Sequence, residues 1–123
     1  MVVHGTDNTY QLARKYKVKL AWGTDLLFNP ANTKNENQGI IKLQKWFSNY
    51  EILKMITHDN AELLSLSGAR NPYPGKLGVI EEGALADIII VNGDVLNDIT
   101  LLGNPEENFQ LIMKDGKIYK NQL

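Results

Sequence analysis

The chain of 123 residues contains no cysteine. This absence excludes disulfide frameworks, thiolate metal sites and cysteine nucleophiles together. It fits a reducing compartment. Apolar runs are short, far below the roughly 18 residues that a membrane-spanning helix needs. The first residues also lack the basic and then apolar pattern of a signal peptide. We therefore expect a soluble, cytoplasmic protein that does not associate with membranes.

An excess of charge of one sign is also missing. The chain carries 13 basic and 14 acidic side chains, a formal net charge of −1, and its lysines are dispersed. Such a balance gives no steering field for nucleic acid or an anionic membrane. Hydrophobic residues make up 43% of the chain, which is enough to build a core. We expect a globular protein with no nucleic-acid partner.

Histidine is scarce, with only His4 and His58 in the chain. A metal site built on two histidines usually shows His-x-His or an i, i+4 pair on a helix, and these two are far apart in sequence. His58 falls near the end of a predicted helix, where an imidazolium would complement the helix dipole. His4 falls in an N-terminal segment that we expect to be mobile. Neither histidine is predicted to be a ligand.

The most informative segment that is present runs from Lys17 to Asp25. Its apolar and polar residues alternate up to Trp22, which is typical of a strand, and Gly-Thr-Asp then presents one carboxylate at the tip. Asp25 has two interpretations. It is a metal ligand or general base at a strand end, or it is a turn aspartate that accepts hydrogen bonds from nearby backbone amides. The residues alone leave both open.

Helical signals dominate the rest of the first half. Ser48 and Glu51 form a Ser-x-x-Glu capping box, and the helix that it opens is predicted to run to about Thr57. Asn60 is predicted to cap the next short helix, which Gly68 ends. The remaining helical segments are predicted over residues 8–16, after capping residues at 6–8, and over 40–47.

A composition shift near residue 68 indicates a boundary. Residues 68–83 are rich in glycine and proline, and the pattern that follows is strand-like. Apolar β-branched residues at 86–91 predict one strand, and Asp115-Gly116 predicts a hairpin between strands at 109–113 and 118–119. We predict two parts, residues 1–67 and residues 68–123.

Three of these segments together resemble the C-terminal part of metal-dependent amidohydrolases, especially the imidazolonepropionase-like and Xaa-Pro dipeptidase-like branch. Lys17–Asp25 resembles the eighth barrel strand, which ends in Gly-Thr-Asp. Residues 50–68 resemble the helices that follow the barrel. Residues 82–88, Glu-Gly-Ala-Leu-Ala-Asp-Ile, are similar to the family's Glu-Gly-Lys-x-Ala-Asp-Leu pattern, within returning strands of a small β-sandwich.

The resemblance implies an α/β fold: the end of a (β/α)8 barrel in residues 1–67 and part of a composite β-sandwich in residues 68–123. In the family, the aspartate matching Asp25 binds a divalent metal, usually zinc, and takes a proton from the attacking water. The family's other ligands, a His-x-His pair, further histidines and often a carboxylated lysine, lie on earlier strands that have no match here. The resemblance therefore implies hydrolysis of a C–N bond as the ancestral reaction, with Asp25 as the one inherited site residue.

Three interpretations follow for this polypeptide. It is a truncated or separately expressed amidohydrolase piece, inactive alone and without a tightly bound metal. It is a non-catalytic module that forms homo-oligomers through the strand edges and apolar surface that the absent strands would cover. Or it is one half of a split enzyme, whose missing N-terminal half is a second polypeptide.

Overall fold

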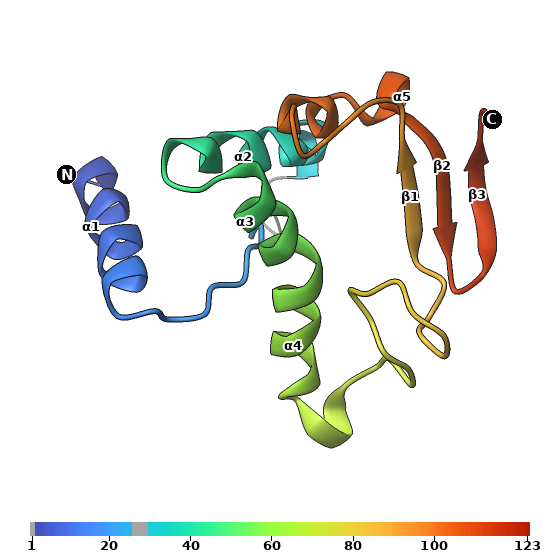
Figure 1. The fold of residues 1–123 in the computed structure, drawn as a ribbon, viewed down its shortest axis with the longest axis horizontal. Helices are drawn as coiled ribbons and strands as arrows, with labels where there is room; N and C mark the ends of the chain where they lie inside the picture. Colours follow the sequence, from blue (N-terminus) through green and yellow to red (C-terminus); the bar gives the residue numbers. More distant parts are fainter. Residues whose placement is uncertain (1, 26–29) are drawn as a thin grey trace.

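The computed structural model describes residues 2–25 and 30–123, a mixture of helices and one three-stranded sheet (Figure 1). The helices lie mostly in the first two thirds of the chain and the sheet in the last third. The α-helices are α1 (Val2–Lys15), α2 (Glu36–Lys42), α3 (Asn49–Lys54), α4 (Asn60–Ser65) and α5 (Pro105–Asn108), and the strands are β1 (Ile88–Val91), β2 (Phe109–Lys114) and β3 (Lys117–Asn121). Short 3₁₀ segments are Pro30–Asn35, Leu43–Lys45, Gly68–Arg70 and Ile99–Gly103.

Helix α1 begins earlier than predicted. The expected helix over residues 8–16 with caps at 6–8 is wrong in its start, because these capping residues lie inside the helix. Asp7 instead points outward from α1 and accepts hydrogen bonds from the Trp46 indole and the Lys45 ammonium, both at 2.7 Å. The Tyr10 ring packs at a tilt against Trp46 and edge-on against Phe47, with ring centroids 4.9 and 5.1 Å apart. These contacts dock α1 on the corner between α2 and α3.

Helices α3 and α4 form one nearly continuous rod. The predicted capping box is confirmed: the Ser48 side chain accepts from the Glu51 amide and the Glu51 carboxylate accepts from the Ser48 amide. Between the two helices, Met55–Asp59 forms a π-helical turn. His58 therefore lies in the middle of the rod, so the predicted position near a helix C-terminus is wrong. Asn60 has helical backbone angles and is the first residue of α4, not the residue that caps it. Its predicted capping role is therefore also wrong.

The sheet has the order β1-β2-β3 with both pairs antiparallel. The three strands confirm the strand-like pattern of the sequence, and Asp115-Gly116 forms the predicted hairpin turn with φ angles of 49° and 75°. Positive φ at both central positions is the requirement of a type I′ turn. The Asp87 carboxylate accepts a hydrogen bond from the Asp115 amide at 2.7 Å, which ties this turn to the start of β1.

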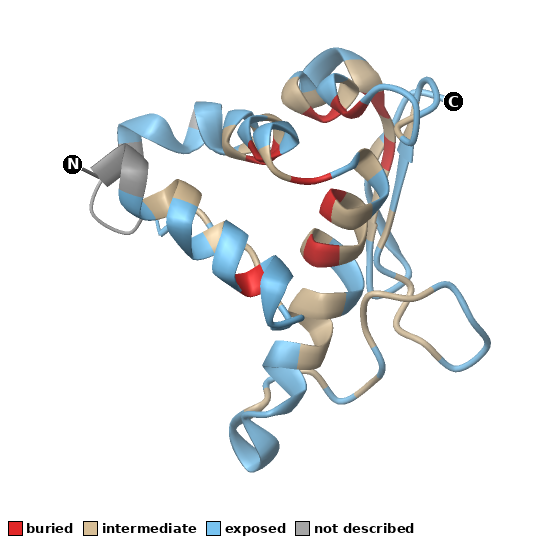
Figure 2. Ribbon diagram, turned by 60° about the vertical axis from the view of Figure 1, so that its left-hand side comes forward, coloured by how far each residue is buried: buried red, intermediate tan, exposed pale blue. Residues whose placement is uncertain are grey.

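The core is small and lies where α2, α3 and the 3₁₀ segment Ile99–Gly103 meet the first residue of β2 (Figure 2). Ile52 and Ile99 are its fully buried members. Helix α2 is fixed to the 3₁₀ segment by the Asn37 amide, which donates to the Leu102 carbonyl at 2.7 Å. The core therefore draws on both sides of the predicted boundary at residue 68. In the described part of the chain, no helix is long and apolar enough to cross a membrane.

Candidate functional site

Residues 18–25 are extended but are not a strand, so the predicted strand of Lys17–Trp22 is wrong as an element of a sheet. A strand needs a neighbour whose backbone accepts and donates hydrogen bonds, and no described strand lies beside this segment. The segment crosses between α1 and the α3–α4 rod as an isolated length of chain (Figure 1).

Asn60 supplies the missing neighbour at one point. Its Oδ1 accepts from the Trp22 amide at 2.8 Å and its Nδ2 donates to the Trp22 carbonyl at 2.9 Å. The side-chain amide thus pairs with both backbone groups of one residue, as a strand would. This pair fixes the extended segment three residues before Asp25, against the first turn of α4.

Asp25 lies at the end of this segment, exposed and with φ of +50°. A non-glycine residue in the left-handed region is uncommon, although aspartate tolerates it better than most residues. The conformation is compatible with both interpretations of Asp25, because turn aspartates and carboxylates held out for a ligand each occur there. The residues that follow, 26–29, lie outside the described part of the chain.

A polar cavity of about 540 Å³ lies beside this tip, between Gly23-Thr24 and the N-terminal part of α2. Glu36 and Lys42 are its charged members, and amide side chains supply most of its remaining polar atoms. Glu36 is the carboxylate that the fold brings toward the Gly-Thr-Asp turn. This cavity could accept a small polar molecule, but its walls contain no histidine.

The one histidine whose side chain the structure describes, His58, does not group with Asp25. His4 lies within α1 rather than in a loose N-terminal segment, and its side chain is outside the described part of the chain. His58 instead meets two carboxylates on the α3–α4 rod: its Nδ1 lies 3.0 Å from Asp59 Oδ1 and 4.0 Å from Glu62 Oε2. The sequence signal for this group is the i, i+4 spacing of His58 and Glu62, which shows that the two lie on one helix face without predicting the contact.

Two lysines already neutralise these carboxylates. Lys54 pairs with Asp59 and Lys19 pairs with Glu62. Desolvation raises the pKa of Asp59, but hydrogen bonds and charge from Lys54 and His58 outweigh it and leave that pKa below its ordinary value. The hydrogen bond from Lys19 lowers the pKa of Glu62, and the same contact raises the pKa of Lys19. We interpret the group as an ion-pair network that fixes residues 17–20 to the rod.

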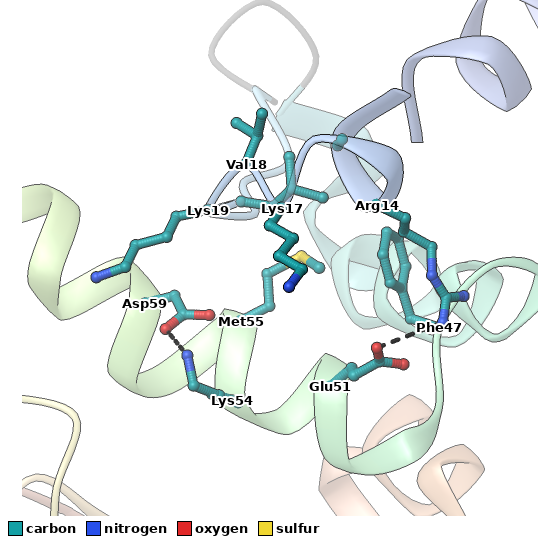
Figure 3. A pocket seen from close by; sticks show the side chains of 11 residues that line it. Arg14, Lys17, Val18, Lys19, Phe47, Glu51, Lys54, Met55 and Asp59 are labelled. Carbon is teal, nitrogen blue, oxygen red and sulfur yellow. Dashed lines mark hydrogen bonds and ion pairs between the residues drawn. The ribbon is translucent and has the colours of Figure 1, made fainter. Parts of the chain in front are cut away.

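The same network borders a cavity of about 440 Å³ between the end of α1, residues 17–20 and the α3–α4 rod (Figure 3). Arg14 and Glu51 face each other across one end, 3.6 Å apart, and Lys54 and Asp59 pair at the other. A hydrogen bond to the Ser48 backbone lowers the pKa of Glu51. Most of the charges in this cavity are thus paired with each other, which is a structural arrangement rather than a catalytic one.

The described residues do not complete a metal centre around Asp25. Among them, the one group of three or more possible ligands that lie close together is His58, Asp59 and Glu62, which excludes Asp25. A divalent metal held tightly needs three or four protein ligands in a fixed geometry. The described residues therefore do not fit a metal centre around Asp25 as a whole site.

Solved structures resemble this fold over nearly its whole length. An amidohydrolase superimposes with a TM-score of 0.79 and 29% sequence identity, covering 94% of this chain and 26% of its own. A. niger ochratoxinase gives a TM-score of 0.72 and 26% identity over 91% of this chain and 24% of its own. A prolidase complexed with N-methylphosphonate-L-proline gives 0.77 and 24% identity, covering 94% of this chain and 26% of its own.

No protein-family model matches the chain, and no curated protein matches its sequence. The structural neighbours nevertheless confirm the resemblance to amidohydrolases that the sequence indicated, and the prolidase shares the fold. The chain spans about a quarter of the length of these proteins. Its fold is thus that of a segment of a larger amidohydrolase-like protein, consistent with a C-terminal fragment.

Proposed function

We propose that this chain is a segment of a metal-dependent amidohydrolase that hydrolyses a C–N bond. Residues 1–67 would be the end of a (β/α)8 barrel, with the extended segment 18–25 as its last strand. Residues 68–123 would be the C-terminal part of a composite β-sandwich. The observation that carries this proposal is the superposition over 94% of the chain with an amidohydrolase.

The extended segment supports this assignment because it has the backbone shape of a strand without a partner strand. Among the described residues, Asn60 pairs with the backbone of Trp22 and the Val18 amide donates to the Ala13 carbonyl, but no strand pairs with the segment. Strands from elsewhere could therefore pair with most of its backbone. At the C-terminal end of a barrel strand, Asp25 would point toward the face where such barrels bind their substrates. The chain would thereby contribute one ligand to a zinc or similar divalent site, and such a metal activates water at neutral pH.

We propose a small amide, a cyclic amide or a dipeptide as the substrate class, and the cytoplasm as the compartment. This substrate class follows from the resemblance to amidohydrolases, with which the chain superimposes over 94% of its length. Because a lone exposed carboxylate holds a metal weakly, we expect no turnover from the isolated chain.

A complementation assay tests this proposal. The chain is mixed with the remaining part of the 29% identical amidohydrolase, from which the matching segment has been deleted, and zinc or manganese is added. We expect hydrolysis from the mixture, none from either piece, and loss of activity with Asp25→Ala. The control is Asp115→Ala, which removes an aspartate from the hairpin turn far from the tip. The expected inactivity would be contradicted if the chain alone hydrolysed the substrate and Asp25→Ala abolished this activity. If the mixture kept its rate of hydrolysis with Asp25→Ala, Asp25 would not belong to the site.

A second candidate function, a self-associating structural module, is supported by the surface of the chain. Its solvent-accessible surface is 9120 Å², whereas a compact monomer of 13.8 kDa exposes about 6,600 Å². Large apolar side chains are part of this excess, among them Tyr16, Leu66 and Ile80. A second polypeptide that supplies the rest of a split enzyme would cover the same surface. The gene context separates these cases: an adjacent reading frame encoding His-x-His and further histidines would favour the split enzyme.

A further inference from the structure

We propose that two copies of this chain pair through the free edge of β1, joining their sheets into one antiparallel sheet of six strands. The inference specifies the surface used by the self-associating module proposed above and is independent of the hydrolytic proposal. It rests on the edge, composition and exposure of β1, on the groove beside it and on the uncovered area of the molecule.

Strand β1 lies at the edge of the sheet, with β2 as its one partner among the described residues. Its sequence is Ile-Ile-Ile-Val, and Ile89 and Ile90 are 52% and 40% exposed. An edge strand presents a row of unpaired N–H and C=O groups to any strand that approaches. An exposed edge composed wholly of β-branched apolar residues is therefore a template for strand addition.

The opposite edge of the sheet is protected. Strand β3 carries Lys117 and Lys120 within five residues, and charged side chains on an edge, lysine above all, discourage pairing with another chain. Lys120 is also occupied, because its ammonium donates to the carbonyls of Pro105 and Glu106. This difference between the edges selects β1 as the one that pairs.

A groove of about 440 Å³ runs beside β1, and its lining is mostly apolar. Leu53 and Ile56 from the α3–α4 rod line it, together with Ile88 and Ile89 of β1 and the loop around Val79. Ile80 on this loop is 93% exposed. Apolar side chains from an added strand would find partners in this groove.

An antiparallel second copy fits this edge better than a charged partner would. Four apolar residues pair with themselves in antiparallel register without placing like charges opposite each other. Such a register about the centre of β1 puts Asp87 of one copy beside Asn92 of the other, and not beside the second Asp87. The formal net charge of −1 on each chain adds little repulsion between copies.

The uncovered area is also sufficient. Stable interfaces bury about 800 Å² on each partner, and the accessible surface of 9120 Å² exceeds that of a compact monomer by roughly 2,500 Å². Pairing of β1 together with cover over the groove would use part of this excess.

Sedimentation equilibrium of the purified chain at micromolar concentrations tests the proposal. We expect a mass of twice the monomer, a monomer for Ile89→Lys, and an unchanged dimer for Tyr119→Lys, which places the same charge on the opposite edge. Circular dichroism establishes that each variant is folded. A monomeric wild type overturns the proposal, and so does a dimer that Tyr119→Lys dissociates and Ile89→Lys leaves intact.

Because the chain has no cysteine, single-cysteine variants give a second and geometric readout. Ile89→Cys, Ile90→Cys and a mixture of the two cover the three central registers, and a disulfide forms where Cα atoms come within about 7 Å. We expect at least one of these samples to crosslink into a dimer on oxidation, and Tyr119→Cys to remain uncrosslinked. Crosslinking of Tyr119→Cys with none at 89 or 90 overturns the proposed edge.

The complementation assay separates this inference from the hydrolytic proposal. A monomeric chain that restores hydrolysis leaves the amidohydrolase assignment intact and removes the β1 dimer. If Ile89→Lys dissociates the dimer and no mixture shows hydrolysis, the β1 dimer stands and the amidohydrolase assignment is removed.

Discussion

At the scale of single residues, Asn60 is the side chain on which the position of the extended segment most depends. Its amide makes hydrogen bonds to both backbone groups of Trp22 and a longer one, 3.4 Å, to the Ile56 carbonyl. Both Asn60 and Trp22 are partly buried. Polar groups in such a position cost free energy when they lose their partners.

Asn60→Ala should therefore lower the free energy of unfolding by about 1–3 kcal/mol, because the Trp22 amide and carbonyl lose their partners. Urea denaturation measures the change, and hydrogen exchange at Trp22 should accelerate in parallel. Asn92→Ala is the matched control, since Asn92 is exposed and its side chain makes no hydrogen bond with the described residues; it should change stability by less than about 0.5 kcal/mol. Equal effects of the two substitutions would contradict the bridging role of Asn60.

Residue-scale prediction from the sequence succeeded where the signal was local. The Ser48–Glu51 capping box depends on four consecutive residues, and the structure forms it as predicted. The pairing of Asn60 with Trp22 joins positions 38 apart and leaves no local pattern. Asp25 stays a predicted metal ligand, because its partners would have to come from outside the described residues.

At the scale of elements, the rod from α3 through the π-helical turn to α4 collects three carboxylates whose pKa values are lowered. The pKa of Glu51 is lowered by its hydrogen bond with the Ser48 backbone, and the pKa of Glu62 by its hydrogen bond with Lys19. Desolvation raises the pKa of Asp59, but Lys54 and His58 outweigh it and lower that pKa. A π-helical turn widens the helix locally, and this one places His58 and Asp59 at the level of residues 17–20. The ionised forms of all three groups are thus favoured by the fold.

Acid should consequently destabilise the protein. A carboxyl group whose pKa is lower in the folded state contributes stability above its unfolded pKa, near 4, and loses it as the pH falls through the folded value. We expect the free energy of unfolding to be level from neutral pH to about pH 5 and to fall below that. Urea titrations from pH 6 to 3 measure this slope, and Asp59→Asn together with Glu51→Gln should flatten it. An unchanged slope in that double variant would exclude these groups as its source.

The loop at Gly78, in the segment after residue 68, packs closely against the rod. A Cβ at Gly78 would lie 2.7 Å from the Thr57 carbonyl oxygen and 2.9 Å from Ala61 Cβ, and the φ of this glycine is +73°. Gly83 has a similar φ of +83° with open space around it. A side chain at either glycine would therefore strain the left-handed backbone, but only at Gly78 would it also clash with neighbouring atoms.

Gly78→Ala should destabilise the protein by about 1 kcal/mol from the left-handed backbone, as Gly83→Ala should, and further because the loop must move away from Thr57. Thermal denaturation of both variants measures the difference between their melting temperatures. Because the backbone strain is common to both, this difference reflects only the contact of the loop with the rod. Limited proteolysis between residues 71 and 86 should accelerate for Gly78→Ala only. Matching melting temperatures for the two variants would show that the loop does not depend on this contact.

Element prediction from the sequence worked for helices and the hairpin and failed for the extended segment. The Ser48–Glu51 capping box and the Asp115-Gly116 turn act within a few residues and form as predicted. The helix predicted over residues 40–47 is instead α2, Glu36–Lys42, followed by the 3₁₀ segment Leu43–Lys45. The alternation in Lys17–Trp22 describes a segment suited to a sheet, but a strand also needs neighbours that this chain does not supply among the described residues. The start of α1 was misplaced because good capping residues at 6–8 are also tolerated within a helix.

At the scale of the whole molecule, the small core and the large surface have one cause. The fold corresponds to about a quarter of its structural neighbours, so side chains that a larger protein would bury are exposed here. The resemblance to amidohydrolases predicted strand edges and apolar surface of this kind, but the composition of the chain did not. Its apolar content is that of an ordinary globular domain, and the excess surface became evident once the described residues were placed in space.

The distribution of the core gives a prediction for unfolding. Ile52 and Ile99 are both fully buried, belong to one cluster and lie on opposite sides of the predicted boundary between residues 67 and 68. Because each side contributes to the same cluster, we expect a single cooperative transition in calorimetry. Ile52→Ala and Ile99→Ala should each lower the stability of that one transition by about 2–5 kcal/mol, whereas Leu123→Ala, at an exposed position, should leave it nearly unchanged. If each substitution instead shifted a separate transition, the two predicted parts would fold independently and the shared cluster would contribute little to their association.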